Sequence, residues 1–282
     1  MKKRILLAVA VFLGIAAYAQ DAAELINKAN EALKANQFAE AFELYDKAMA
    51  NLGDVQVDEA INFNIGFAAM QAEKNDAALV YFDKAIEAGV NVAKCHEFKG
   101  TVYNKLKDYP NALASYEKGI EASEDKPGAL LMNAAITAFR IEQFEKAIKY
   151  FDMAYQAGFK AEDALLNKAM AMKKMDNDEG YKQTLMVGVE KFPANKKIAG
   201  ALANAYVVDG NSFYKAGVDV LNAANKKVNE GTLKTDEDTY KAEVDKAKEE
   251  FKKALEVLNL AVKLDPENAN AKKLIDACNQ VK

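Results

Sequence analysis

A triplet of small, large and small apolar residues recurs about every 34–38 residues along this chain. Its members stand at positions i, i+4 and i+7, so they share one face of a helix. Small residues on that face let a partner helix approach closely, and the larger middle residue fills the space between the two helices. The copies are Ala41/Tyr45/Ala48, Ala78/Phe82/Ala85, Ala112/Tyr116/Gly119, Ala147/Phe151/Ala154, Tyr181/Leu185/Gly188, Ala216/Val220/Ala223 and Ala254/Leu258/Ala261. A fixed period of this length predicts stacked helical repeats and not one globular core.

Each period holds two helical patterns, the triplet marking the second. In the fourth period, Leu131, Ala134, Ala135 and Ala138 share one face of a first helix. Glycines that favour helix ends are predicted to lie in turns: Gly53, Gly89, Gly158 and Gly210. The pattern predicts an all-α solenoid of about six to seven helix–turn–helix repeats.

The regular period breaks near the C-terminus. Residues 226–250 are dense in charge, and the helix that follows is predicted over about 236–264. A helix of that length exceeds the average of about 11–12 residues, so we expect it to project partly into solvent. Its charged face is interpreted as a solvated surface, with a partner-docking arm as the alternative. A short last helix over about 270–280 is expected to cap the stack.

These residues resemble the tetratricopeptide repeat family. The match includes Ile65-Gly66, Gly100 with Tyr103, Ala135 and the closing segment 264–268, and it extends from about Ala22 to the C-terminus. The family's tryptophan position departs from the pattern, since it holds Leu25, Asn62, His96, Leu131 and Leu165. The resemblance implies a right-handed α-solenoid in which the first helices line a concave face.

The N-terminal residues have the layout of a secretory signal peptide. Lys2, Lys3 and Arg4 precede an apolar run over 5–17 and a small-x-small site that ends at Ala19. We therefore expect a signal peptide over 1–19, repeats 1–6 over 20–228, and a charged insert, long helix and cap over 229–282. An uncleaved anchor is the alternative, although the apolar run is short for a bilayer. The localisation expected is the periplasm or cell envelope.

Charge and cysteine usage exclude several classes of partner. Removal of the leader's three positive charges takes the formal net charge from −4 to −7 and leaves Arg140 as the single arginine. An acidic chain without a basic run is a poor ligand for nucleic acid. Cys95 and Cys278 are far apart in sequence, so we interpret both as unpaired packing residues. Two cysteines and one histidine do not supply a zinc site, and no cofactor is expected.

No nucleophile motif, phosphate loop or dinucleotide fingerprint occurs, so the sequence predicts no enzymatic activity. His96 is assigned a structural role. The acidic run 176–180 superficially resembles a calcium loop, but its glycine is one residue early and Met186 or Val187 replaces the bidentate glutamate. A turn between two helices is the better interpretation. Acidic residues are too numerous to single out a catalytic pair.

What remains is a surface on the first helices. Residues 60–70 are apolar on nearly every side, so that helix requires cover on all sides. The cover is either a bound peptide or helix held by phenylalanine and methionine anchors, or tight self-packing of the stack. The candidate groove residues are Asn30, Phe63, Asn64, Phe67, Met70, Lys94, Met132, Asn133, Ile136, Phe139, Leu166, Asn167 and Met170.

Polar residues of this surface have two further interpretations. Asn30, Asn64 and Lys94 occupy three of the five positions of the family's carboxylate clamp, but Ile26 and Phe98 replace the remaining basic residues. The complete clamp is therefore not expected. The asparagines that recur at one helix position either hydrogen-bond a bound backbone or pair within the stack: Asn27, Asn64, Asn133 and Asn167.

The sequence thus predicts a non-enzymatic scaffold or adaptor that binds other proteins, with no integral membrane span after signal cleavage. The alternative is a self-associating solenoid subunit of a larger envelope complex.

Overall fold

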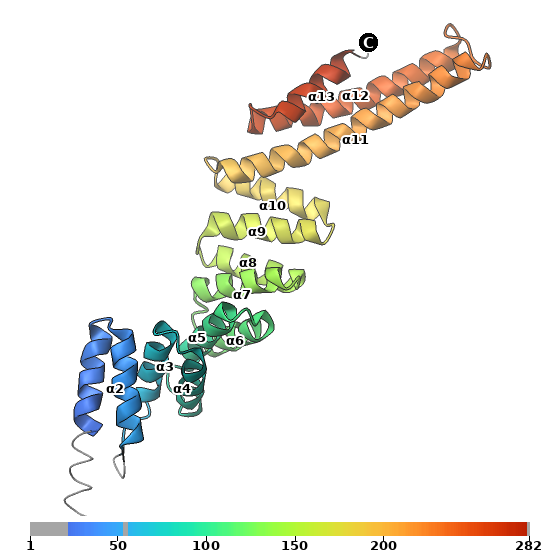
Figure 1. Ribbon diagram of the computed structural model, residues 1–282. Coiled ribbons are helices and arrows are strands. Elements are labelled where there is room, and N and C mark those ends of the chain that lie inside the picture. The colour runs from blue at the N-terminus through green and yellow to red at the C-terminus, as the bar shows by residue number, and fades with distance from the viewer. Residues whose placement is uncertain (1–21, 53–55, 281–282) are drawn as a thin grey trace, which may run out of the picture. The chain divides into compact units, whose positions relative to one another are not determined.

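The computed structural model describes residues 22–52 and 56–280, and the predicted signal peptide and the turn glycine Gly53 lie outside them. Within this part every regular element is a helix. The chain divides into two compact units, Met1–Phe159 and Lys160–Lys282. Helix–turn–helix pairs make up each unit, as Figure 1 shows. The predicted all-α fold of helix–turn–helix repeats is confirmed.

The described part of the first unit contains four helix pairs. A helix over 22–34 pairs with α2 (Phe38–Ala50), and the later pairs are α3 (Ile61–Gln71) with α4 (Asn75–Glu87), α5 (Val92–Lys105) with α6 (Tyr109–Ala122), and α7 (Gly128–Arg140) with α8 (Phe144–Gln156). The second helices α2, α4 and α6 also contact the first helix of the next pair, which is α3, α5 and α7 respectively. The core is therefore a continuous row of small interfaces.

The second unit contains two pairs and a last helix within its described residues. Its elements are α9 (Ala161–Lys174), α10 (Asp178–Lys191), α11 (Lys196–Asn229), α12 (Asp238–Leu264) and α13 (Ala269–Gln280). The predicted final helix is confirmed by α13, which contacts both α11 and α12. The acidic run 176–180 forms the predicted turn, where the Asn177 side chain accepts a hydrogen bond from the Gly180 backbone N–H at 2.9 Å.

The triplets of the first five periods and the last one are buried as predicted. In two of them, the large middle residue lies against a glycine of the first helix. A Cβ placed on Gly66 would stand 2.8 Å from the Phe82 ring, and one on Gly100 would stand 2.4 Å from the Tyr116 ring. Real Cβ contacts are not that short, so glycine is what allows these helix pairs to close.

One type of backbone turn closes the first helix of five successive pairs. In each, a residue with positive φ is followed by an N–H that bonds to the carbonyl oxygen five residues earlier, which is the Schellman arrangement. The left-handed residues are Asn36, Glu73, Lys107, Glu142 and Asp176. The turns therefore repeat with the helices, even though none of these residues is glycine.

The sixth pair departs from the prediction. Gly210 is expected in a turn, but it is buried in the middle of α11, a helix of 34 residues. The predicted sixth triplet is also wrong in register, since Ala216 and Ala223 are exposed while Gly217 and Ala224 are buried. The Schellman turn that closes the first helix occurs instead at Gly231, where φ is +72°.

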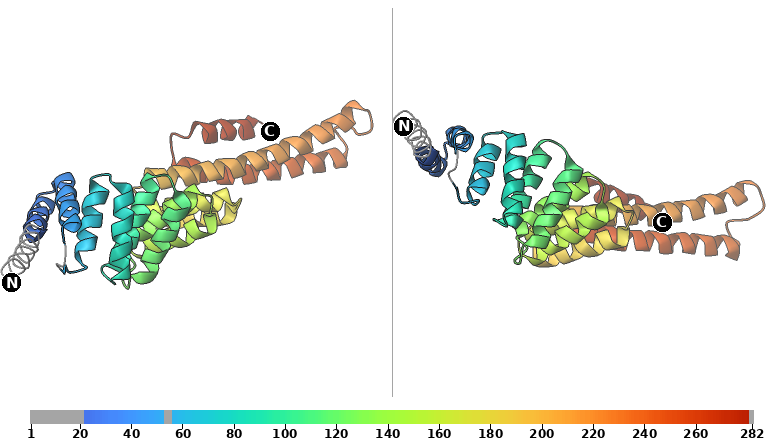
Figure 2. Two further views of the ribbon diagram at one scale, coloured as in Figure 1. Left: turned by 60° about the horizontal axis from the view of Figure 1, so that its bottom comes forward. Right: turned by 90° about the horizontal axis from the view of Figure 1, so that it is seen from below.

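The continuous α11 is explained by the face that α12 presents to it. Buried small residues recur every seven positions on α11, at Ala203, Gly210, Gly217 and Ala224. They face the buried seam of α12, which consists of Ala247, Phe251, Ala254, Leu258 and Ala261. Had α11 ended at Gly210, Phe251 would have lost its partner. The predicted long helix therefore does not stand alone, because it forms a hairpin with α11 (Figures 1 and 2).

Gly210→Ala is expected to destabilise the hairpin. Its Cβ would lie 2.6 Å from Leu258 Cγ, and overpacking of this kind costs about 1–3 kcal/mol. Gly200→Ala in the same helix is the matched control, because nothing lies within 4 Å of the added Cβ. There the better helix propensity of alanine should stabilise the protein by about 0.5–1 kcal/mol. Urea unfolding followed by circular dichroism measures both, and equal stabilisation by the two substitutions would disprove the close packing.

Candidate functional site

A chain of phenylalanine rings occupies part of the predicted groove in the first unit. Phe63 and Phe67 of α3 both lie against Phe98 of α5, with ring centroids 6.0 and 5.4 Å apart. Phe38 of α2 meets Phe67 edge to face at 5.8 Å. Such pairs contribute about 0.5–1.5 kcal/mol beyond the area that they bury. Phe63, Phe67 and Phe98 are half-buried, so their rings are neither sealed inside the unit nor free in solvent.

These contacts bear on what covers the apolar helix α3, for which the alternatives are a bound segment and self-packing of the stack. Self-packing of neighbouring helices supplies a large part of the cover, because α3 contacts α2, α4 and α5. Part of each ring nevertheless stays accessible. The resulting surface is rich in aromatic side chains, a residue type that is enriched at the centres of protein interfaces.

Three polar residues of the predicted groove have partners within the chain. Asn30 Oδ1 accepts a hydrogen bond from the Tyr45 hydroxyl at 2.6 Å, and Tyr45 is fully buried. Lys94 pairs with Glu97 at 2.9 Å and lies 4.9 Å from the centre of the Phe98 ring. The Asn167 amide donates to the Asp163 carbonyl oxygen at 2.8 Å, within its own helix. The other two groove asparagines, Asn64 and Asn133, are half-buried.

The remaining apolar candidates differ in accessibility. Met132 is only 5% exposed, whereas Ile136 on the same helix is 40% exposed. Phe139 lies edge-on to Phe144 with ring centroids 5.5 Å apart, and Met70 is half-buried. Leu166 and Met170 belong to the second unit, where Leu166 packs on the core and Met170 is 36% exposed. Within the first unit, the structure brings Phe63 and Phe67 together through Phe98, a residue that stands out in the sequence only as a departure from the clamp.

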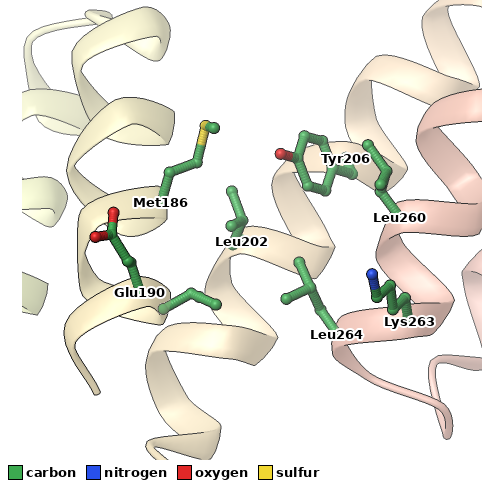
Figure 3. Close-up of a pocket in the computed structure, with 8 residues that line it drawn as sticks. Met186, Glu190, Leu202, Tyr206, Leu260, Lys263 and Leu264 are labelled. Atoms are coloured by element: carbon green, nitrogen blue, oxygen red, sulfur yellow. The ribbon is translucent and has the colours of Figure 1, made fainter. Parts of the chain in front are cut away.

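A second apolar site lies in the second unit and is absent from the sequence prediction. It is a pocket of about 390 Å³ whose floor is formed by Leu202 and Tyr206 of α11. One wall is α10 and the other is α12, as Figure 3 shows. The wall residues are Met186, Val189 and Glu190 on α10 and Leu260, Lys263 and Leu264 on α12.

The sequence contained a signal for this pocket, namely large apolar residues on second helices outside the triplet positions. Met186 and Leu260 are two such residues, and the structure shows them 51% and 45% exposed. The apolar residues of the predicted groove lie on first helices alone. The pocket also requires residues of α10, α11 and α12 to meet, which local spacing does not reveal.

The cysteines and the single histidine of the described chain are shaped by burial. No three His, Cys, Asp or Glu side chains within residues 22–52 and 56–280 are placed to hold a metal ion. Cys95 and Cys278 are free and buried, and burial raises the pKa of the Cys95 thiol to about 11. Burial is also the main cause that lowers the pKa of His96, followed by nearby Lys99 and Lys118. A thiol with a raised pKa is a poor nucleophile at neutral pH.

Stacked helix pairs with exposed apolar patches define a helical-repeat protein. Residues 93–126, which span α5 and α6, match the family model described as a tetratricopeptide repeat. This segment is one tetratricopeptide repeat, and the chain as a whole has the fold of tetratricopeptide repeat proteins. This fold is typically non-catalytic and indicates a scaffold for protein–protein interactions. No helix of the described residues is long and apolar enough to cross a membrane.

Two solved structures with TM-scores above 0.5 share the fold at low sequence identity, and a third is similar in sequence. A tetratricopeptide repeat protein from Parabacteroides merdae is 18% identical, with 92% of this chain and 99% of that chain covered and a TM-score of 0.51. The C-terminal part of a repeat protein from Cytophaga hutchinsonii is 16% identical, with 88% and 98% covered and a TM-score of 0.53. A repeat protein from Bacteroides fragilis is 24% identical, with 93% and 99% covered and a TM-score of 0.39. No curated protein matches the sequence.

The pairing of Asn30 with Tyr45 predicts a stability effect. Asn30→Ala would leave the buried Tyr45 hydroxyl without its acceptor, which costs about 1–3 kcal/mol. Tyr45→Phe removes that hydroxyl and leaves only the half-buried amide, so it should cost less, and the double variant should resemble Tyr45→Phe. Urea unfolding of the three variants measures the difference. An Asn30→Ala variant as stable as wild type would show instead that Asn30 is not needed by the fold.

Proposed function

We propose that this protein is a non-enzymatic adaptor of the bacterial cell envelope that binds a peptide or helical segment of another protein. The binding surface is the half-exposed apolar row on the first helices of the first unit, which is defined by Phe63, Phe67 and Met70 of α3 and by Ile136 and Phe139 of α7. The single observation that carries the proposal is the set of partly exposed rings Phe63, Phe67 and Phe98.

The arrangement of these rings supports binding with little reorganisation. Phe63 and Phe67 are held by contact with Phe98, so their positions exist before a ligand arrives. A preformed surface lowers the ordering cost of binding, which otherwise opposes association. Ile136, at 40% exposure, adds an accessible aliphatic contact on α7. An amphipathic helix or an extended apolar segment is the ligand class that such a surface accepts.

The envelope location rests on the N-terminal sequence. A positive leader, an apolar run and a small-x-small site are followed by an acidic repeat region. The protein would therefore act on exported partners.

Partner capture tests the binding surface. Ile136→Glu and Phe67→Glu should each abolish capture of the envelope proteins that wild type retains, because a buried carboxylate opposes apolar binding. Val80→Glu is the matched control, since Val80 is 52% exposed but lies on the second helix α4. Affinity capture from envelope extracts with quantitative mass spectrometry is the measurement, after circular dichroism has verified folding. Retention of the same partners by all four proteins would refute the surface assignment.

Export predicts a defined mature N-terminus. N-terminal sequencing of the protein from fractionated cells should begin at Gln20 and find the chain in the periplasmic or envelope fraction. A chain that still carries Lys2 to Arg4 and sediments with membranes would support the uncleaved anchor instead.

A further inference from the structure

The pocket between α10 and α12 has an apolar centre and two opposite charges. Leu202 and Tyr206 form its floor, while Met186 and Leu260 stand on facing walls at 51% and 45% exposure (Figure 3). A pocket of about 390 Å³ with such walls accepts one or two apolar side chains. All of its residues belong to the second unit, so the pocket is separate from the phenylalanine row on α3 and α5.

The two charges lie on opposite walls of this pocket. Glu190 is on α10 and Lys263 is on α12 (Figure 3). Within the described chain Glu190 has one ion pair, a 3.8 Å contact with the adjacent Lys191, and its side chain is 76% exposed. An exposed pair of this kind contributes little. No ion pair of Lys263 occurs among the residues that the structure describes.

We propose that this pocket, with its walls on α10 and α12, is the site at which a second copy of this chain docks about a two-fold axis. In a two-fold interface, residue i of one copy meets residue j of the other, and j meets i. An apolar patch with one carboxylate and one ammonium on opposite sides is complementary to itself under that rotation. Each Glu190 then meets the other copy's Lys263, and the exposed Met186 and Leu260 side chains of each copy enter the apolar pocket of the other.

Charge complementarity favours a second copy over an unrelated segment. A purely apolar segment would leave both Glu190 and Lys263 at the edge of the contact without partners, whereas a second copy pairs both. The chain is acidic, with a formal net charge of −4 that becomes −7 without the predicted leader, so two copies repel each other at long range. The walls of this pocket hold one charge of each sign, and contact there avoids that repulsion.

Sedimentation velocity of the purified protein over a range of micromolar concentrations tests the proposal. Wild type should show a monomer–dimer equilibrium. Glu190→Lys and Lys263→Glu should each weaken dimerisation by at least about tenfold, because either change makes both pairs of the dimer like-charged. Lys252→Glu is the matched control, since it makes the same change on α12 eleven residues from Lys263, which is roughly 16 Å along the helix and beyond the screening length. It should dimerise as wild type does.

Mixing the two defective variants provides the decisive measurement. In a mixed dimer, the lysine introduced at position 190 of one copy would face the glutamate introduced at position 263 of the other, and the remaining pair is the native Glu190 with Lys263. Equimolar Glu190→Lys and Lys263→Glu should therefore dimerise together, although neither does so alone. The double variant should also recover self-association.

Several outcomes would overturn the proposal. They are a wild type that is monomeric at all concentrations, a dimer that tolerates both single reversals, and a mixture of the two variants that stays monomeric. A protein that stays monomeric and binds a different protein in this pocket would also overturn the proposal.

This test is independent of the adaptor function. Its readout is the oligomeric state, and none of its substitutions touches α3 or α7. Loss of the dimer in the charge variants therefore leaves capture through Phe67 and Ile136 to be judged separately.

Discussion

The structure depends on the close contact between a small residue on one helix and a large residue on its partner. Gly66 and Gly100 on first helices receive the rings of Phe82 and Tyr116, and Gly210 receives the side chain of Leu258. In each case an added Cβ would stand 2.4–2.8 Å from the large side chain. Because the helices touch at these points, the large residue is enclosed and its apolar surface leaves water, at about 25 cal/mol per Å². Repetition of this contact, and not a single central core, holds each unit together.

The same contact explains the hairpin of α11 and α12. Small residues at intervals of seven on α11 continue the close approach well beyond the length of an ordinary repeat. Phe251 packs on Gly217 just as Leu258 packs on Gly210. The hairpin is thus a sixth pair with both helices lengthened. Its outer face is exposed to solvent, and this is why charged residues occupy it. Its close packing also brings Leu260 and Lys263 of α12 beside α11 and opposite α10, where the second apolar site forms.

The two apolar surfaces differ in what covers them. On α3, the rings of Phe63 and Phe67 have Phe98 as a neighbour within the chain, so the surface is partly satisfied before any partner binds. In the pocket of the second unit, Met186 and Leu260 remain about half exposed, and neither Glu190 nor Lys263 has a strong ion pair among the described residues. This difference is the reason for proposing a bound segment on the first surface and a second copy of the chain on the second.

Local spacing in the sequence determined the helix pairs, because residues placed at i, i+4 and i+7 lie on one face whatever the rest of the chain does. Tyr45, Phe82, Tyr116 and Phe151 belong to the core on that ground and are buried. The sequence also determined the absence of a recognisable catalytic motif and the long helix α12. Only the tertiary structure shows that α11 continues through Gly210. A glycine in that position either ends a helix or makes room for a bulky neighbour. The side chain of Leu258 on α12 occupies that room and distinguishes the two cases. It also decided that Asn30 accepts a hydrogen bond from Tyr45 and that Met186 and Leu260 line opposite walls of one pocket. These residues belong to different helices, and their separation in sequence carries no information about where the helices come together.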